Sequence, residues 1–240
     1  MKVLKLIFAA AIILSFTSCT KQVTETEPVA KTDNIYQYGT MQKFLDRNFD
    51  GSLTIKELKK HGDFGLGTYN GVNGEMVVSE GRVYRILPSG EPFEVSEAEL
   101  SPYTVVKFFE ADTSFALNYT MSLEELKAYI KELIADTTKP VAIRISGEYE
   151  KAKTRTVEKQ TKPYPSLDEI VANQIVFNFE NIKGTAIGYW FPDYFETVNF
   201  PGFHFHFLKD GASGGGHLLD CTISNVTVEL DYPEDLIVGF

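Results

Sequence analysis

Three of the four histidines in this sequence lie close together in one stretch, GFHFHFLKDGASGGGHLLD, at residues 202–220. Within this stretch, residues 203–208 alternate phenylalanine with histidine, which is the pattern of a β-strand with two different faces. Side chains two positions apart on a strand point to the same face. His204 and His206 are therefore predicted to project together, while the phenylalanines fill the opposite face.

A glycine-rich run at residues 211–216 follows this strand and brings a third histidine, His217, to the start of a second strand. Glycine can reverse the chain there because it tolerates positive φ. Three imidazoles leave a zinc ion at least one open position, as in catalytic sites, whereas structural sites usually have four ligands. We predict a metal site at His204, His206 and His217, with zinc first and iron, manganese or nickel as alternatives. The remaining alternative is three half-buried strand histidines that hydrogen-bond to backbone carbonyls.

Residues 1–19 are typical of a signal peptide. Lys2 and Lys5 precede an apolar run at residues 6–16 that is too short to span a bilayer as a permanent helix. The ending Phe-Thr-Ser-Cys resembles a bacterial lipobox, in which Cys19 becomes the lipidated first residue of the mature protein. We therefore expect an exported, membrane-anchored lipoprotein. The alternative is an ordinary cleaved signal peptide and a periplasmic or secreted protein.

Residues 20–34 are polar and aperiodic, and they predict a flexible tether before a folded domain at residues 35–240. The sequence is 43% hydrophobic, which is enough to bury a core. Its net charge of −10 argues against a nucleic-acid partner, and we expect membrane contact only through the lipid anchor. If Cys19 is lipidated, Cys221 has no partner and no disulfide forms. A homodimer is left open.

The domain is predicted to be α+β. Alternating segments predict strands, among them a hairpin at residues 75–78 and 82–86 and strands at 141–149, 174–179 and 185–191. Capping-box patterns predict a helix at residues 123–134 and a shorter one after Ser166. We expect mostly antiparallel or mixed β-sheets in two closely associated sub-domains, with a few short helices and the metal site on the C-terminal strands.

Residues 46–57, DRNFDGSLTIKE, match the spacing of a twelve-residue calcium loop, with Asp46 and Glu57 at its ends. The same residues fit a second interpretation, in which Thr54 and Glu57 form a capping box that opens a short helix. Calcium loops of this type usually occur in pairs, and the sequence contains no second loop. The capping interpretation is therefore favoured.

Four motifs resemble the α-acetolactate decarboxylase family and occur in that family's order between about Leu53 and Leu230. They are GDFGLGT followed by NGEMVV, then AIRISGEY with KTRTVEKQTKPYPSL, then KGTAIGYWFPDY, and finally the histidine stretch. The resemblance implies a zinc ion held by the three histidines. It also implies decarboxylation of 2-acetolactate to acetoin and carbon dioxide, with zinc as the electron sink for the enediolate.

The same resemblance assigns roles to other residues. It implies that Glu75 is an active-site carboxylate near the metal, that Thr68 lines the same pocket, and that Arg144 faces the substrate and holds its carboxylate. Glu75, Arg144 or a metal-bound water is expected to reprotonate the enediolate. From the residues alone, a solvated strand end is favoured for Glu75 and a surface cation for Arg144, and the motif match reverses this preference.

One departure from the family pattern concerns the C-terminal end. The resemblance implies a further segment with an acidic residue that reaches the zinc, whereas this sequence stops at Phe240. Glu234 and Asp235 are the candidates for a replacement, but nothing in their spacing supports either. The alternative function, from another class, is an exported cupin-like metal- or ligand-binding protein without turnover.

Overall fold

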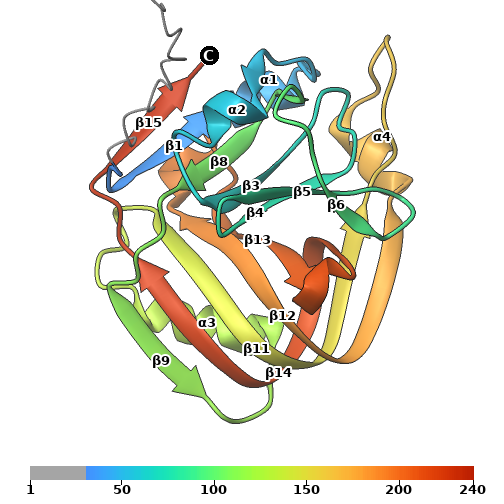
Figure 1. Cartoon of the computed structure of the whole chain (residues 1–240). Helices are drawn as coiled ribbons and strands as arrows, with labels where there is room; N and C mark the ends of the chain where they lie inside the picture. Colours follow the sequence, from blue (N-terminus) through green and yellow to red (C-terminus); the bar gives the residue numbers. More distant parts are fainter. Residues whose placement is uncertain (1–30) are drawn as a thin grey trace, which may run out of the picture. The chain divides into compact units, whose positions relative to one another are not determined.

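The computed structural model describes residues 31–240, which are built mainly of β-strands (Figure 1). The predicted signal peptide and residues 20–30 of the predicted tether lie outside the described residues. Lys31 and Asp33, from the end of that tether, already contact the fold through ion pairs with Asp63 and Lys107. Between residues 31 and 240, no helix is both long and apolar enough to cross a membrane.

The first sheet is antiparallel except at one edge, where β1 and β15 pair in parallel. In spatial order its strands are β15 (Asp235–Gly239), β1 (Asn34–Tyr38), β8 (Thr104–Lys107), β3 (Phe64–Thr68), β4 (Glu75–Ser79), β5 (Arg82–Ile86) and β6 (Pro92–Glu94). The predicted hairpin is confirmed as β4 and β5. A separate small sheet pairs β2 (Leu53–Thr54) with β7 (Leu100–Ser101).

The second sheet contains the three longest strands and is antiparallel. Its strands are β9 (Thr113–Leu117), β10 (Met121–Ser122), β11 (Val141–Thr156), β12 (Ile175–Phe191), β13 (Gly202–Lys209) and β14 (Gly215–Asp231). The two strands predicted at residues 174–179 and 185–191 are one continuous strand, β12. Its polar middle keeps its pairing with β11, where Lys183 and Glu148 form an ion pair of 3.0 Å.

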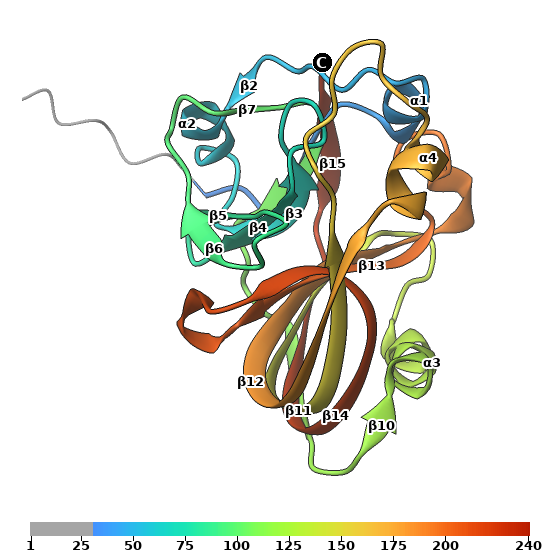
Figure 2. The ribbon, with the colours of Figure 1, turned by 90° about the vertical axis from the view of Figure 1, so that its right-hand side faces the viewer.

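Short helices cover the ends and the outer face of these sheets (Figure 2). They are α1 (Met41–Leu45), α2 (Ile55–Leu58), α3 (Leu123–Leu133) and α4 (Leu167–Ala172), with 3₁₀ turns at Asp193–Phe195 and Asp210–Ala212. The capping boxes predicted at Ser122 and Ser166 are both formed, and each serine accepts a hydrogen bond from a backbone N–H three residues later. The predictions of α3 and α4 are therefore confirmed.

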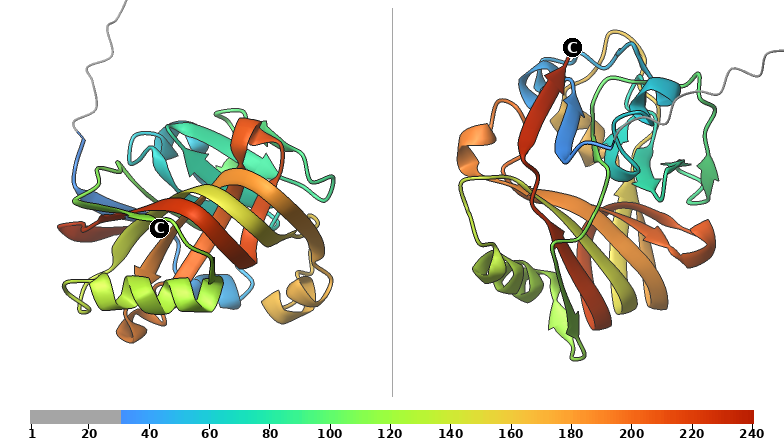
Figure 3. Two further views of the ribbon diagram at one scale, coloured as in Figure 1. Left: turned by 90° about the horizontal axis from the view of Figure 1, so that it is seen from below. Right: turned by 60° about the vertical axis from the view of Figure 1, so that its left-hand side comes forward.

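The two faces of the second sheet belong to two different hydrophobic cores. Ala186 and Trp190 point into a core beneath α3, which lies across the outer face of the sheet (Figure 3). Ile187, Tyr189 and Phe191 alternate with them and point into the core shared with the first sheet. The two sheets therefore correspond to the two associated sub-domains of the prediction, and the expected α+β class is confirmed.

A buried ion pair connects the two sheets. Lys107, at the end of β8, is fully buried, and its ammonium group contacts Asp231 at the end of β14 and lies 2.8 Å from Asp33. The other carboxylate oxygen of Asp231 accepts a hydrogen bond from the backbone N–H of Glu110. Burial raises the pKa of Asp231, and the positive charge of Lys107 opposes this rise.

The loop that matches a calcium-binding pattern has other partners for its acidic side chains. Asp50 pairs with Lys162 at 2.6 Å and accepts a hydrogen bond from the Tyr164 hydroxyl. Glu57 pairs with Lys60 at 2.6 Å, and its backbone N–H donates to the Thr54 hydroxyl at the start of α2. The carboxylates do not converge. Thr54 caps α2 as expected, but the Glu57 carboxylate pairs with Lys60 and does not complete the predicted capping box.

Candidate metal site

The histidines occupy neighbouring strands of the second sheet, as predicted. His206 on β13 lies opposite His217 on β14, and His204 projects from the same face of β13 as His206. Phe205 and Phe207 are buried on the opposite face, in the core beneath α3. Strand alternation therefore sends the imidazoles between the two sheets and the phenylalanines away from the site.

Gly216 sets the position of His217. Its φ of 132° lies in the region that favours glycine, and a Cβ at this position would stand 2.4 Å from the backbone oxygen of Arg155. Glycine therefore allows β14 to approach β11 closely, immediately before His217. The glycine-rich run thus determines where the third imidazole lies, in addition to reversing the chain.

The ring nitrogens of the three histidines converge. One ligand nitrogen from each lies within 4.8 Å of the others, and Nε2 of His204 lies 3.1 Å from Nδ1 of His217. Nδ1 of His206 lies 2.7 Å from the backbone oxygen of Met76 and therefore carries the proton. This bond leaves the lone pair of His206 Nε2 directed toward the cluster, the arrangement that orients histidine ligands in metal sites.

Burial keeps the three imidazoles neutral. It lowers the pKa of His204 to about 4 and lowers the pKa values of His206 and His217 well below the usual range. The positive charge of Arg155 adds to this effect at each histidine. Neutral imidazoles offer the lone pairs that a transition metal needs, so this group of residues can hold a metal ion.

Glu75 and Thr68, both predicted from the sequence, lie beside the histidines. Glu75 is buried, with one carboxylate oxygen 3.4 Å from Nε2 of His206 and the other 3.1 Å from Nη1 of Arg155. Burial raises the pKa of Glu75, and Arg155 opposes the rise. Thr68 is the cross-strand neighbour of Glu75, and its hydroxyl donates to the backbone oxygen of Gly74.

Arg144, the predicted substrate-facing arginine, does not lie at this site. Its guanidinium forms two hydrogen bonds with Glu229, of 2.6 and 2.8 Å, and stacks over the ring of Phe109 in a separate depression. Arg155 takes the position beside Glu75. Both arginines are on β11, but a rise of about 3.3 Å per residue places them roughly 35 Å apart along the strand.

The acidic residues near the C-terminal end are also distant from the histidines. Asp235 begins β15 and pairs with Asn34 of β1, at the edge of the first sheet. The backbone N–H of Glu234 donates to the backbone oxygen of Asp33. Neither side chain lines the histidine cavity, so neither of these candidates replaces the acidic residue that the resemblance implies.

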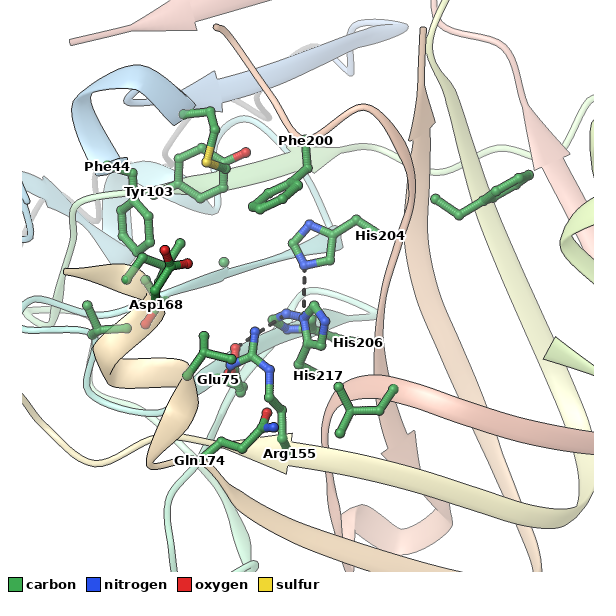
Figure 4. A pocket seen from close by; sticks show the side chains of 18 residues that line it. Phe44, Glu75, Tyr103, Arg155, Asp168, Gln174, Phe200, His204, His206 and His217 are labelled. Atoms are coloured by element: carbon green, nitrogen blue, oxygen red, sulfur yellow. Dashed lines mark hydrogen bonds and ion pairs between the residues drawn. The ribbon is translucent and has the colours of Figure 1, made fainter. Parts of the chain in front are cut away.

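A cavity of about 500 Å³ opens onto the histidines between the two sheets (Figure 4). The first sheet and α1 supply one wall, with Phe44, Thr68, Glu75 and Tyr103, and β11, β13, β14 and α4 supply the other. Arg155, Tyr103 and Gln174 were not predicted as site residues. Arg155 alone had a sequence signal, since it lies within the family motif KTRTVEKQTKPYPSL.

One cavity between the two sheets holds three neutral imidazoles, a buried carboxylate and a guanidinium. This combination defines a metal-binding enzyme site. The alpha-acetolactate decarboxylase family matches residues 35–240. The chain belongs to the alpha-acetolactate decarboxylase family.

Individual relatives agree with this assignment. The alpha-acetolactate decarboxylase of Bacillus licheniformis is 37% identical over 205 residues, covering 85% of this chain and 81% of the relative. That of Methanosarcina mazei is 38% identical, covering 83% of this chain and 69% of the relative. The crystal structure of the Bacillus subtilis enzyme has a TM-score of 0.83 and 35% identity, covering 85% of this chain and 88% of that chain. The alternative of a cupin-like binding protein is not supported, because this family is one of decarboxylases.

Proposed function

We propose that this protein decarboxylates 2-acetolactate (2-hydroxy-2-methyl-3-oxobutanoate) to acetoin. The observation that supports this most directly is the convergence of three neutral histidines, Glu75 and Arg155 in one cavity. The relatives named for the same reaction supply the substrate. A cavity of about 500 Å³ has room for this small acid.

The reaction requires a group that accepts the bonding electron pair left behind by carbon dioxide. When the bond between the carboxyl carbon and C2 breaks, that pair moves toward the neighbouring ketone, whose oxygen gains negative charge. A divalent metal held by His204, His206 and His217, for which we propose zinc, would supply Lewis-acid stabilisation of that charge when bound. The histidines themselves contribute a rigid and neutral donor set, because their strands fix their positions.

Arg155 is positioned to hold the substrate carboxylate before it leaves. Its guanidinium is permanently charged and planar, and it can form two parallel hydrogen bonds to a carboxylate. The side chain is 15% exposed, so water competes little for this contact. We propose Arg155 for the role that the sequence prediction gave to Arg144.

Glu75 and Arg155 are the candidates for the final proton transfer. Loss of carbon dioxide leaves an enediolate that must accept a proton on carbon to become acetoin. The Glu75 carboxyl group and the Nη atoms of Arg155 lie side by side next to the histidines, so either can donate from a fixed direction. A Glu75→Gln variant keeps the size of the side chain but removes its acid, and we expect it to bind metal and lose most turnover.

The first test uses protein that begins after Cys19, with racemic acetolactate as substrate. We expect acetoin and carbon dioxide, loss of both products after chelation, and recovery when zinc is restored. Circular dichroism before and after chelation checks that the protein stays folded. The absence of acetoin from folded, zinc-loaded protein would overturn the proposal.

We also propose that the protein is exported and anchored through a lipid on Cys19, on the basis of residues 1–19. Mass spectrometry of the mature N-terminus tests this proposal. A diacylglyceryl group on Cys19 is the expected result, and an unmodified N-terminus at another residue would contradict lipidation.

A further inference from the structure

Two residues that line the histidine cavity each have a buried side-chain polar atom without a hydrogen-bond partner. Within residues 31–240, the buried side-chain atoms without a partner are the Tyr103 hydroxyl, Oε1 of Gln174 and Nε of Arg85. The first two belong to residues that line the cavity. An unpaired buried polar atom lowers the stability of the fold. Such atoms are rare in folded proteins, so their concentration in one cavity points to a ligand that pairs with them.

Tyr103 is held firmly in an apolar wall. Its side chain is 4% exposed, and its ring packs against Phe44 with 5.5 Å between ring centroids. Its backbone oxygen accepts hydrogen bonds from the backbone N–H of Thr68 and from the Ser101 hydroxyl. Burial raises the pKa of Tyr103, so its hydroxyl stays protonated and is a hydrogen-bond donor at neutral pH. The ring is therefore fixed, and the hydroxyl is its one polar group.

Tyr103 and Arg155 lie on different sides of the histidines. Figure 4 shows Tyr103 with Phe44 and Phe200 on one side of the cluster, and Arg155 with Gln174 on the other. The ring of Phe200 packs edge-on against the ring of His204, with 5.9 Å between the ring centroids. A substrate that places its carboxylate at Arg155 therefore turns its opposite end toward Tyr103.

We infer that the Tyr103 hydroxyl donates a hydrogen bond to the acetyl oxygen of the bound substrate. The inference rests on the proposed function for the identity of that substrate. It makes Tyr103 a specificity-determining residue that favours 2-hydroxy acids with an oxygen on C3 over those without one. The acetyl oxygen gains negative charge as carbon dioxide leaves, so the bond strengthens during the reaction. Removal of the hydroxyl therefore weakens binding and also lowers kcat.

The test compares Tyr103→Phe with the wild type in zinc-loaded protein. Calorimetry measures the affinity of two unreactive acids, 2,3-dihydroxy-2-methylbutanoate, which has an oxygen on C3, and 2-hydroxy-2-methylbutanoate, which lacks it. We expect the preference of the wild type for the first acid to fall about tenfold in the variant, as for the loss of one buried hydrogen bond. Any contribution of the metal to this preference is common to both proteins and cancels.

Thermal stability separates a ligand-binding hydroxyl from a structural one. Tyr103→Phe removes a group without a protein partner, so the Tm of the ligand-free protein should not fall. Tyr149→Phe is the matched control, because the hydroxyl of buried Tyr149 donates to the backbone oxygen of Ile145 at 2.8 Å, in the core beneath α3. The control should lower Tm and leave the ligand preference unchanged.

The outcomes distinguish this inference from the proposed function. An unchanged preference in Tyr103→Phe, or a fall in Tm as large as that of Tyr149→Phe, overturns the inference even if acetolactate is decarboxylated. A wild type that makes no acetoin overturns the proposed function, while a tenfold loss of preference still supports the hydrogen bond. Failure of the wild type to bind either acid overturns the inference, and the proposed function still stands if that protein makes acetoin.

Discussion

Arg155 and Arg144 lie on the same strand and have different surroundings. Arg155 shares the histidine cavity with Glu75, whereas Arg144 is bound by Glu229 in a separate depression. Proximity to the cavity, and not membership of a motif, therefore decides which arginine can contact a substrate. The two residues form a natural pair for mutagenesis.

We predict that Arg155→Gln lowers kcat/KM for acetolactate by roughly a hundredfold or more, because a carboxylate contact made during the reaction is lost. Arg144→Gln should keep kcat/KM within about threefold and lower Tm, since it leaves Glu229 without its partner. Steady-state kinetics and bound zinc are measured for both variants. Equal losses of activity at both positions would contradict the assignment of Arg155.

A second prediction at this scale concerns Cys221, which is 3% exposed and free. Burial raises the pKa of its thiol to about 12, so roughly one thiol in ten thousand is ionised at pH 8. Protein that begins after Cys19 has this single thiol, and it should react with a thiol reagent only after unfolding. Rapid stoichiometric labelling of the native protein would show that the thiol is accessible.

The sequence predicted some site residues and not others, for physical reasons. The alternation around His204 and His206 predicted that both imidazoles lie on one face, because strand periodicity fixes which side chains share a face. Arg144 was misplaced because a motif shows that an arginine is present but not how far along a strand it lies. Tyr103 had no signal, since one of 12 tyrosines becomes distinctive only when the surrounding fold leaves its hydroxyl unpaired.

At the scale of elements, close contact between β14 and β11 determines where the third imidazole lies. Gly216 and Gly211 both have positive φ, but a Cβ would clash with β11 only at Gly216 and would meet open space at Gly211. Substitution of Gly211 therefore introduces only backbone strain, whereas substitution of Gly216 introduces both backbone strain and a steric clash. The sequence indicated the turn but could not indicate the contact with β11.

We predict that Gly216→Ala weakens zinc affinity by at least tenfold, because moving β14 away from β11 displaces His217 from the other two histidines. Gly211→Ala should lower stability by about 1 kcal/mol through its positive φ and leave zinc affinity unchanged. Competition with a chromogenic chelator measures affinity, and urea unfolding measures stability. Similar zinc affinities in the two variants would show that the close contact is unimportant.

Strand length was the other feature at this scale that the sequence did not reveal. The polar segment of β12 around Lys183 predicts a break between two strands. The pairing of β12 with β11 continues through it, because polar side chains on the outer faces of a sheet do not interrupt backbone hydrogen bonds. Local pattern therefore identified the strands but underestimated their length.

On the scale of the whole molecule, the site exists only where the two sheets meet. Glu75 and Thr68 come from the first sheet, and the histidines and Arg155 come from the second. The contact between Lys107 and Asp231 is a buried polar link between these sheets. Its removal therefore tests how strongly their association depends on one ion pair.

We predict that Lys107→Met lowers the free energy of unfolding by about 3–5 kcal/mol, because it leaves Asp231 buried without its charge partner. Lys183→Met is the control, since Lys183 and Glu148 form an exposed pair whose loss should cost at most about 1 kcal/mol. Urea unfolding of both variants measures the difference. Equal stability of the two variants would show that the buried pair adds little.

The parallel pairing of β1 with β15 also affects how the chain acquires its structure. Asn34 of β1 pairs with Asp235 of β15, two hundred residues further along the chain. At about 5–20 residues per second, a ribosome needs roughly 10–40 seconds to make the intervening chain. During that interval one edge of β1 has no neighbour, and an open edge is a template for association with other chains. This topology therefore leaves the edge of β1 open in the newly synthesised chain, whereas β15 covers the same edge in the finished fold.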